Sequence, residues 1–248
     1  GIAEQNLIGL AAGLASEGKK VIATAQACFI SMRSCEQIRQ YMGYMGSKVV
    51  AVGISSGFSL TYFGNTHYAI EDLSIMRSIP GIIILAPSDA GQAAKALMAA
   101  ISQDGPVYIR LGGTLNCPIV YDHDYDYEIG KSIMTVEQEL PEVTIFATGT
   151  MVHNACRASE ILKERDHLLV RVIDMHTVKP LDEAAVDQST DSALLVSIEE
   201  HNVIGGLGSA ISEHISSSRK QSPLLRLGVQ DSFSHPGDYE YLLKQNRL

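Results

Sequence analysis

Short apolar segments that alternate with helical segments constrain the fold of this chain more than any other feature. We expect strands over residues 21–25, 48–54, 82–86, 107–111, 143–147, 168–174, 193–198 and 224–229. We expect helices over residues 4–14, 31–42, 70–76, from 89 onward, and over 151–163, 182–187 and 209–216. Strands that alternate with helices are typical of α/β folds with mostly parallel sheets.

The alternation is interrupted once, over residues 112–128, where Gly, Pro, Asn, Tyr and Asp follow no clear period. A length of 248 residues suits one large domain or two of ordinary size. We therefore predict two consecutive α/β domains: a first domain over residues 1–115, a linker over 116–135 and a second domain over 136–248.

Composition excludes several classes of protein. Hydrophobic residues make up 46% of the chain, which is ample for a buried core, and the formal net charge is −9. Because no basic patch is evident, we expect no nucleic-acid partner. No apolar run reaches the roughly 18 residues that a membrane-spanning helix needs, so we expect no membrane association.

The cysteines predict neither a zinc site nor a disulfide framework. Cys28, Cys35, Cys117 and Cys156 form no C-x-x-C pair, and no histidine cluster accompanies them. Reduced thiols are typical of the cytoplasm, which is where we expect this protein. The chain begins on an internal-looking motif without an initiator Met, and we expect that an N-terminal piece is missing or lies elsewhere.

Glu4 lies at the first turn of the first expected helix. That helix has apolar residues at helical spacing, which predict one buried face: Leu7, Ile8, Leu10, Ala11 and Leu14. An acid in a first turn stabilises the helix dipole by roughly 0.3–1 kcal/mol, and this is one interpretation of Glu4. The other is chemical, because a carboxylate against apolar walls can exchange a proton with a ring nitrogen.

Phe29 and His67 are two further candidates, although each type of residue is more often structural at such a position. Phe29 follows the strand over 21–25, and an aromatic residue there usually belongs to the core. His67 lies at the mouth of a loop rich in Gly, Ser and Asn, where a strand gives way to a helix. The glycine turn over 205–208 is weaker evidence, and close packing of a helix on a sheet explains it.

The order of the motifs is more specific than any one of them. G-I-A-E-Q-N (1–6), E-Q-I-R (36–39), T-H-x-x-I-E-D (66–72), P-S-D (87–89) and G-P-V-Y-I-R-L (105–111) resemble the pyrimidine-binding domain of transketolase. A-T-G-T (147–150), V-I-D-M-H-T-V-K-P-L-D (172–182) and E-E-H-N-V-I-G-G-L-G-S-A (199–210) resemble the transketolase C-terminal domain. The resemblance covers nearly the whole chain and is to the C-terminal subunit of a split transketolase without its opening segment.

The resemblance implies a thiamine diphosphate enzyme that transfers a two-carbon ketol unit from a ketose to an aldose. Glu4 matches the glutamate that hydrogen-bonds N1′ of the cofactor's aminopyrimidine, and Phe29 matches the aromatic residue stacked on that ring. His67 matches a histidine that faces the substrate hydroxyls. Gln26 stands three residues before Phe29, where the family usually has a second aromatic residue.

The chain departs from the family where a sugar phosphate is recognised. Ser55 stands where an upstream loop histidine is expected, and Tyr62-Phe63-Gly64 replaces the acidic G-E-D-G loop. Gly113 stands where an arginine is expected after I-R-L-G. Losing that arginine would remove a bidentate grip on phosphate. We therefore expect an altered substrate, either without phosphate or with another group such as a sulfonate.

The family's G-D-G…N motif, which holds the diphosphate and its metal, does not occur in this sequence. The resemblance thus implies an N-terminal transketolase subunit that carries Mg²⁺ and the diphosphate, and a heterotetramer with two copies of each chain. We predict no metal ligand in this chain.

Two alternatives stay open. One is another thiamine diphosphate enzyme, either the β subunit of a 2-oxo acid dehydrogenase or deoxyxylulose phosphate synthase, although T-H-x-x-I-E-D and E-E-H-N favour transketolase. The other is a non-catalytic paralogue that kept the fold. The departures at Ser55, Phe63 and Gly113 motivate it, whereas the presence of Glu4 and Phe29 opposes it.

Overall fold

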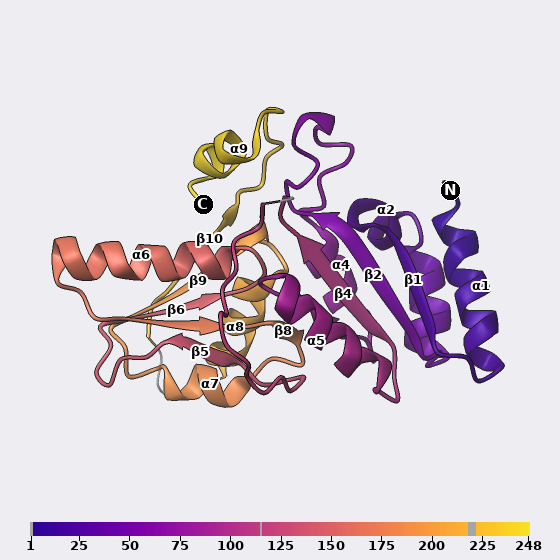
Figure 1. Ribbon diagram of the computed structural model, residues 1–248, viewed down its shortest axis with the longest axis horizontal. Coiled ribbons are helices and arrows are strands. Elements are labelled where there is room, and N and C mark those ends of the chain that lie inside the picture. The colour runs from indigo at the N-terminus through magenta and orange to yellow at the C-terminus, as the bar shows by residue number, and fades with distance from the viewer. Residues whose placement is uncertain (1, 115, 218–221) are drawn as a thin grey trace.

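The computed structural model describes residues 2–114, 116–217 and 222–248, and within them the strands form two five-stranded sheets. Figure 1 shows the two sheets side by side, with the first half of the chain in indigo to magenta and the second half in salmon to yellow. Most strand pairs are parallel, which confirms the predicted α/β class with mostly parallel sheets.

The first sheet has the order β1-β2-β4-β3-β8. Its strands are β1 (Val21–Gln26), β2 (Val49–Ser56), β3 (Ile83–Leu85), β4 (Val107–Gly112) and β8 (Thr177–Lys179). Val49 and Ala51 face one side of β2, and Val50 and Val52 face the other, yet all four are buried. Burial on both faces explains the nearly continuous apolar run that predicted this strand.

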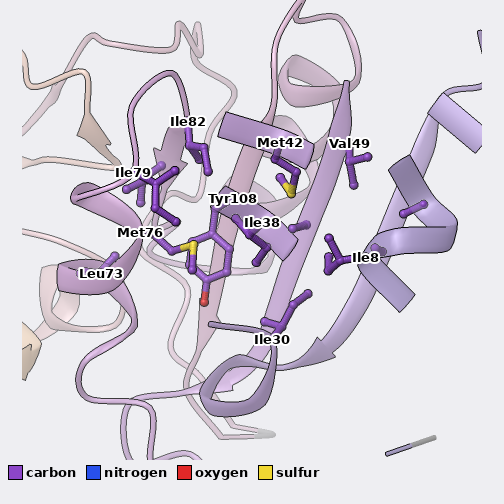
Figure 2. Packing of buried hydrophobic residues seen from close by; sticks show 14 of the residues in the cluster. Ile8, Ile30, Ile38, Met42, Val49, Leu73, Met76, Ile79, Ile82 and Tyr108 are labelled. Carbon is purple, nitrogen blue, oxygen red and sulfur yellow. The ribbon is translucent and has the colours of Figure 1, made fainter. Parts of the chain in front are cut away.

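The helices of the first half cover both faces of this sheet. They are α1 (Glu4–Ser16), α2 (Ala27–Met32), α3 (Cys35–Gln37), the π-helix over Ile38–Tyr44, the short 3₁₀ turn over Thr61–Phe63, α4 (Asp72–Arg77) and α5 (Ala90–Ile101). Side chains from α1, the π-helix and α4 meet on one face around Tyr108, as Figure 2 shows. On the other face, α5 packs against Val50 and Val107.

The core in Figure 2 packs helix α1 against the first sheet. Ile8, Ile38, Met42 and Met76 are fully buried there. Burying one such side chain stabilises the fold by roughly 1.5–3 kcal/mol. Because Ile8 lies one helical turn after Glu4, its packing fixes the position of the helix start that presents Glu4.

Two predictions about these helices are wrong. The single helix expected over 31–42 is broken, since Ser31 and Ser34 each donate a 2.6 Å hydrogen bond to a backbone carbonyl four residues earlier. Such bonds compete with a regular helical ladder. Leu10 and Leu14 were expected in the buried face of α1, but they are 62% and 44% exposed. The buried face instead contains Glu4, Ile8, Ala11 and Ala12.

The second sheet has the order β10-β9-β6-β7-β5. Its strands are β5 (Ile133–Val136), β6 (Val143–Ala147), β7 (Val170–Asp174), β9 (Leu194–Asn202) and β10 (Leu224–Val229). Its helices are α6 (Met151–Asp166), α7 (Glu183–Gln188), α8 (Leu207–Ser216) and α9 (Tyr239–Asn246). The core on one face contains residues of α6, and the core on the other contains residues of α7 and α8. The sequence did not predict β5, β8 or α9.

β8 connects the two halves. It follows β7 in the second half of the chain but pairs antiparallel with β3 of the first sheet. The Ala86 backbone N–H donates to the carbonyl of His176 at 2.8 Å, and the Lys179 ammonium donates to the carbonyls of Arg77 and Ile79. β5 overlaps the predicted linker, and β8 of the second half belongs to the first sheet. The domain boundaries 1–115, 116–135 and 136–248 therefore stay a proposal.

The α-helices seen in the described parts of the chain include none that combines the length and the apolar character needed to cross a lipid bilayer.

Candidate functional site

A cavity of about 660 Å³ opens beside the carboxyl end of β1. Its lining residues all come from the first 67 positions, and they include Glu4, Leu7, Gln26, Phe29 and His67. These residues come from the start of α1, the end of β1, α2 and the loop before α4. Parallel strands of α/β sheets bind ligands at this end, so the cavity lies where the fold predicts a site.

Glu4 contributes a buried carboxylate to this cavity. Its residue is 3% exposed, and Arg33 Nη1 donates a hydrogen bond to its Oε2 at 2.6 Å. Burial acts to raise the pKa of Glu4, but the hydrogen bond from Arg33, a hydrogen bond from the backbone amide of Glu4 itself and the charge of Arg33 together outweigh it, so the pKa lies below its ordinary value. Among the described residues, no side chain donates a hydrogen bond to Oε1. Oε1 is therefore the carboxylate oxygen that no described side chain occupies.

Arg33 is a site residue that the sequence analysis missed. Its guanidinium carbon lies 4.4 Å from the centroid of the Phe29 ring, which is a cation–π arrangement. The same group binds Glu4, so Arg33 connects the two residues predicted to contact the cofactor. The spacing of Phe29 and Arg33 could have indicated their contact, because residues four apart on a helix are neighbours.

His67 lies among aromatic rings. The Phe29 ring meets it edge-on, with centroids 5.3 Å apart, and the Phe63 ring lies 5.1 Å away. The Thr66 hydroxyl and His67 Nδ1 are within hydrogen-bond distance at 2.9 Å, which leaves Nε2 as the nitrogen free of this contact. Phe63 is 66% exposed, so its ring lies at the surface and is not part of the core.

Three predicted residues, Phe63, Ser55 and Gly113, lie outside the lining of this cavity. Ser55 lies near the end of β2 with a φ of 56°, a left-handed conformation that is uncommon for serine and often found near functional sites. Gly113 lines a separate cavity of about 360 Å³ together with Thr150 and Tyr239. Its φ is 88°, and a Cβ there would lie 3.0 Å from Cys117 Sγ, so this backbone position favours glycine.

The donor set of the main cavity suits a flat heteroaromatic ring. Apolar walls and Phe29 can hold the faces of such a ring, and Glu4 can bind a nitrogen at its edge. Nowhere in the described chain do three or more His, Cys, Asp or Glu side chains gather in a way that could hold a metal ion. The lining of the cavity therefore fits the pyrimidine part of thiamine diphosphate.

Comparison with known proteins agrees with this geometry. Residues 1–117 match the family model of the transketolase pyrimidine binding domain, and residues 133–247 match the transketolase C-terminal domain. A Methanocaldococcus jannaschii protein called "Putative transketolase C-terminal section" is 39% identical over 246 residues, which cover 98% of this chain and 76% of that protein. The chain belongs to the transketolase family.

Other relatives refine the position of this transketolase-family chain. A "6-deoxy-6-sulfo-D-fructose transketolase subunit" of Clostridium sp. (strain MSTE9) is 41% identical over 98% of the chain and 74% of its own length. A 1-deoxy-D-xylulose-5-phosphate synthase of Chlorobium luteolum is 35% identical, but the chain spans only 39% of it. The solved structure "Split gene transketolase, inactive beta4 tetramer" aligns with a TM-score of 0.87 at 36% identity, over 98% of this chain and 76% of that one.

These matches confirm the predicted resemblance to a split transketolase subunit and the predicted fold. The roles of Glu4, Gln26, Phe29, His67, Ser55, Phe63 and Gly113 stay predictions.

Proposed function

We propose that this chain is the C-terminal subunit of a two-chain transketolase, which uses thiamine diphosphate to transfer a two-carbon ketol unit from a ketose to an aldose. The observation that carries the proposal is the cavity in which Glu4, Phe29 and His67 meet. Relatives named as transketolase subunits support it. When bound, thiamine diphosphate would supply the nucleophilic carbon that takes up the two-carbon unit.

Glu4 would hydrogen-bond a nitrogen of the pyrimidine ring and exchange a proton with it. The carboxylate lines a mostly apolar cavity and is buried, so water competes weakly for its hydrogen bonds. Arg33 keeps Glu4 ionised in the free chain. A carboxylate that is ionised before the cofactor binds can accept a hydrogen bond from a protonated ring nitrogen without first losing a proton itself.

Phe29 and Gln26 would orient the same ring, and His67 would bind the substrate. Phe29 offers its ring to the cavity, while Gln26, at the end of β1, offers an amide in place of the second aromatic residue. His67 Nε2 would bind a hydroxyl of the ketose, because the contact with Thr66 uses Nδ1. We assign catalytic contacts to Glu4 and His67.

The site requires a second chain. We propose that an N-terminal transketolase subunit contributes the diphosphate and Mg²⁺ site, that two copies of each chain form a heterotetramer, and that the enzyme acts in the cytoplasm. The similar solved structure of a split-gene transketolase is named as an inactive tetramer of β subunits, which supports the view that one kind of subunit is insufficient.

We propose that the substrate is atypical, and a sulfonated ketose is the specific candidate. Phe63 places an exposed aromatic ring beside His67 where the family has an acidic loop. Gly113 provides no guanidinium for a phosphate, and Ser55 no imidazole. The Clostridium relative is named for a sulfo-sugar, which supports the same class of substrate.

The first test is native mass spectrometry of the complex purified from its source. A second chain with thiamine diphosphate and a divalent metal supports the proposal. Isolation of this chain alone, without cofactor even when a partner, thiamine diphosphate and Mg²⁺ are supplied, favours a non-catalytic paralogue. The assembled enzyme is then assayed with ketoses that carry a phosphate, a sulfonate or neither. Efficient use of ordinary pentose phosphates contradicts the altered specificity, and decarboxylation of pyruvate favours a synthase or dehydrogenase.

A further inference from the structure

The loop that carries Phe63 and His67 lies against the second half of the chain. This loop, residues 57–69, leaves β2 and returns to α4, and its ends pair through backbone hydrogen bonds between Gly57 and Ala69. In Figure 1 it forms the purple excursion beside the yellow segment that precedes α9. Within the described ranges, no residue after His67 lines the main cavity, yet the loop has partners far along the chain.

Glu200 of β9 binds the first end of the loop. Its Oε1 accepts a hydrogen bond from the Phe58 backbone N–H at 2.5 Å. Its Oε2 accepts hydrogen bonds from the hydroxyls of Thr150 and Tyr239, each at 2.6 Å. The residue is 1% exposed, so these charge-assisted bonds form away from water and hold the carboxylate in one position.

The backbone of the loop is shaped for this contact. Gly57 has a φ of 60°, and a Cβ at that position would collide with the Glu200 carboxylate. Burial and the neighbouring Glu200 charge raise the pKa of Tyr239, so its hydroxyl stays protonated and remains a donor. The Phe58 amide, the Glu200 carboxylate and the Tyr239 hydroxyl therefore form a chain of hydrogen bonds from the loop to the start of α9.

Arg110 binds the second end of the loop. Its Nη2 donates to the carbonyl of Ala69 at 3.1 Å and to the carbonyl of Glu200 at 2.8 Å, and its Nε donates to Asp72 at 3.0 Å. Arg110 is 3% exposed and Asp72 is fully buried. The first end of the loop is thus bound directly by the Glu200 side chain, and the second end is linked to the Glu200 backbone carbonyl through the Arg110 guanidinium.

The tip of the loop rests on the segment that leads to α9. Asn65 Nδ2 donates to the carbonyl of Ser234 at 2.9 Å, and Gly64 lies against Pro236. Phe58 and Tyr68 pack with Val229, Leu242 and the ring of Tyr239 in one apolar cluster. The first end and the tip of the loop therefore contact the second half of the chain directly, and the second end is linked to it through Arg110.

We infer that Glu200 and Tyr239 are positioning residues: Glu200 binds the Phe58 amide and Tyr239 holds the Glu200 carboxylate, so that together they fix the 57–69 loop and hence the placement of His67 and Phe63 toward the substrate. The role in substrate binding rests on the proposed function, whereas the attachment of the loop to Glu200 and Tyr239 is a property of this chain alone. It gives the second half of the chain a role in substrate binding without a contact to the cavity.

The test compares two tyrosines that each donate to a buried carboxylate. Tyr239→Phe removes the donor to Glu200 and keeps the ring in its cluster. The matched control is Tyr121→Phe, which removes a 2.7 Å hydrogen bond from the hydroxyl to Asp174, away from the loop. Glu200→Gln is the second test variant, because it keeps the shape of the side chain and removes its charge.

Amide hydrogen exchange gives the first readout and needs no activity. In Tyr239→Phe we expect the Phe58 amide and the rest of residues 57–69 to exchange about tenfold faster, while α1 is unchanged. In Tyr121→Phe we expect the loop to exchange at the wild-type rate. Equal loop exchange in the two variants overturns the inference.

The assembled enzyme gives the second readout. In Tyr239→Phe we expect the KM for the ketose to rise about tenfold while thiamine diphosphate affinity stays within about twofold, because Glu4 and Phe29 lie outside the loop. An equal loss of cofactor affinity would indicate general disruption and contradict positioning. If the wild-type complex transfers no ketol unit, the proposed function fails, while hydrogen exchange still decides whether Glu200 holds the loop.

Discussion

Glu4 and Glu200 are both buried carboxylates, but they have opposite surroundings. Glu4 is 3% exposed, lines a cavity and has one side-chain donor, Arg33, on a single oxygen. Glu200 is 1% exposed and, within the described residues, both of its oxygens accept hydrogen bonds from Phe58, Thr150 and Tyr239. A carboxylate whose oxygens are all bound holds structure together, whereas one with an oxygen left over can serve a ligand.

The first way to break this comparison is Glu4→Gln. We expect turnover of the assembled enzyme to fall by at least about 10², because an amide cannot take part in proton exchange with a ring nitrogen. The matched control is Glu17→Gln, an exposed glutamate just beyond the end of α1. Steady-state kinetics with saturating cofactor measure the effect, and near-normal turnover in Glu4→Gln contradicts the assignment.

His67→Asn tests the loop side of the cavity. We expect the KM for the ketose to rise about tenfold, because the variant loses one hydrogen bond to a hydroxyl. Cofactor affinity, measured by titration with thiamine diphosphate, should stay close to wild type since Glu4 and Phe29 remain. A loss of cofactor affinity with unchanged KM would move His67 from the substrate to the cofactor.

Asp174 provides a third kind of buried carboxylate. Its Oδ2 accepts hydrogen bonds from Gln92 and Tyr121, and burial raises its pKa to about 7. The folded state therefore keeps a proton that the unfolded state releases near the ordinary pKa of 3.8. Unfolding releases this proton, so between about pH 4 and pH 7 stability falls as pH rises, by at most about 1.4 kcal/mol per pH unit.

Asp174→Asn removes this titration. We expect the free energy of unfolding of the variant to depend less steeply on pH between about 4 and 7 than that of wild type. Denaturant melts at several pH values measure the two slopes. Burial raises the pKa of Glu199 to about 7 as well, so both proteins should retain some slope. Parallel curves would show that Asp174 does not keep its proton.

Arg33→Gln tests the surroundings of Glu4 and is expected to have the smallest effect of these variants. Without the guanidinium, burial of Glu4 is no longer outweighed, so the pKa of Glu4 should rise. Carboxyl NMR of the free chain measures the midpoint, and the acidic limb of cofactor binding should move to higher pH with it. Arg157→Gln, which affects an exposed ion pair with Glu160, is the control. An unchanged Glu4 midpoint contradicts the role of Arg33.

The sequence predicts the parts of this molecule that depend on local pattern. Helix α1 with Glu4 at its start and the buried strands β2 and β4 follow from periodicity or short motifs. Phe29 and His67 could be named because they belong to motifs that resemble a family. The structure adds that these residues share one cavity.

The remainder depends on contacts between distant residues. Glu200 and Phe58 are 142 positions apart, and nothing in the local pattern around either residue indicates that they meet. β8 has only three residues, too few to show a period, and its partner β3 is far away in the sequence. Leu10 and Leu14 suggested a wider buried face, but α1 packs through Ile8, Ala11 and Ala12 and leaves both leucines exposed.

The placement of β8 has a consequence for where such an enzyme can be divided into separate polypeptides. A cut in the connection between the two family-model matches would give a first fragment whose β3 edge has unpaired backbone groups. Exposed strand edges of this kind promote aggregation. Gene fission, in engineering or in evolution, is therefore opposed between the two sheets.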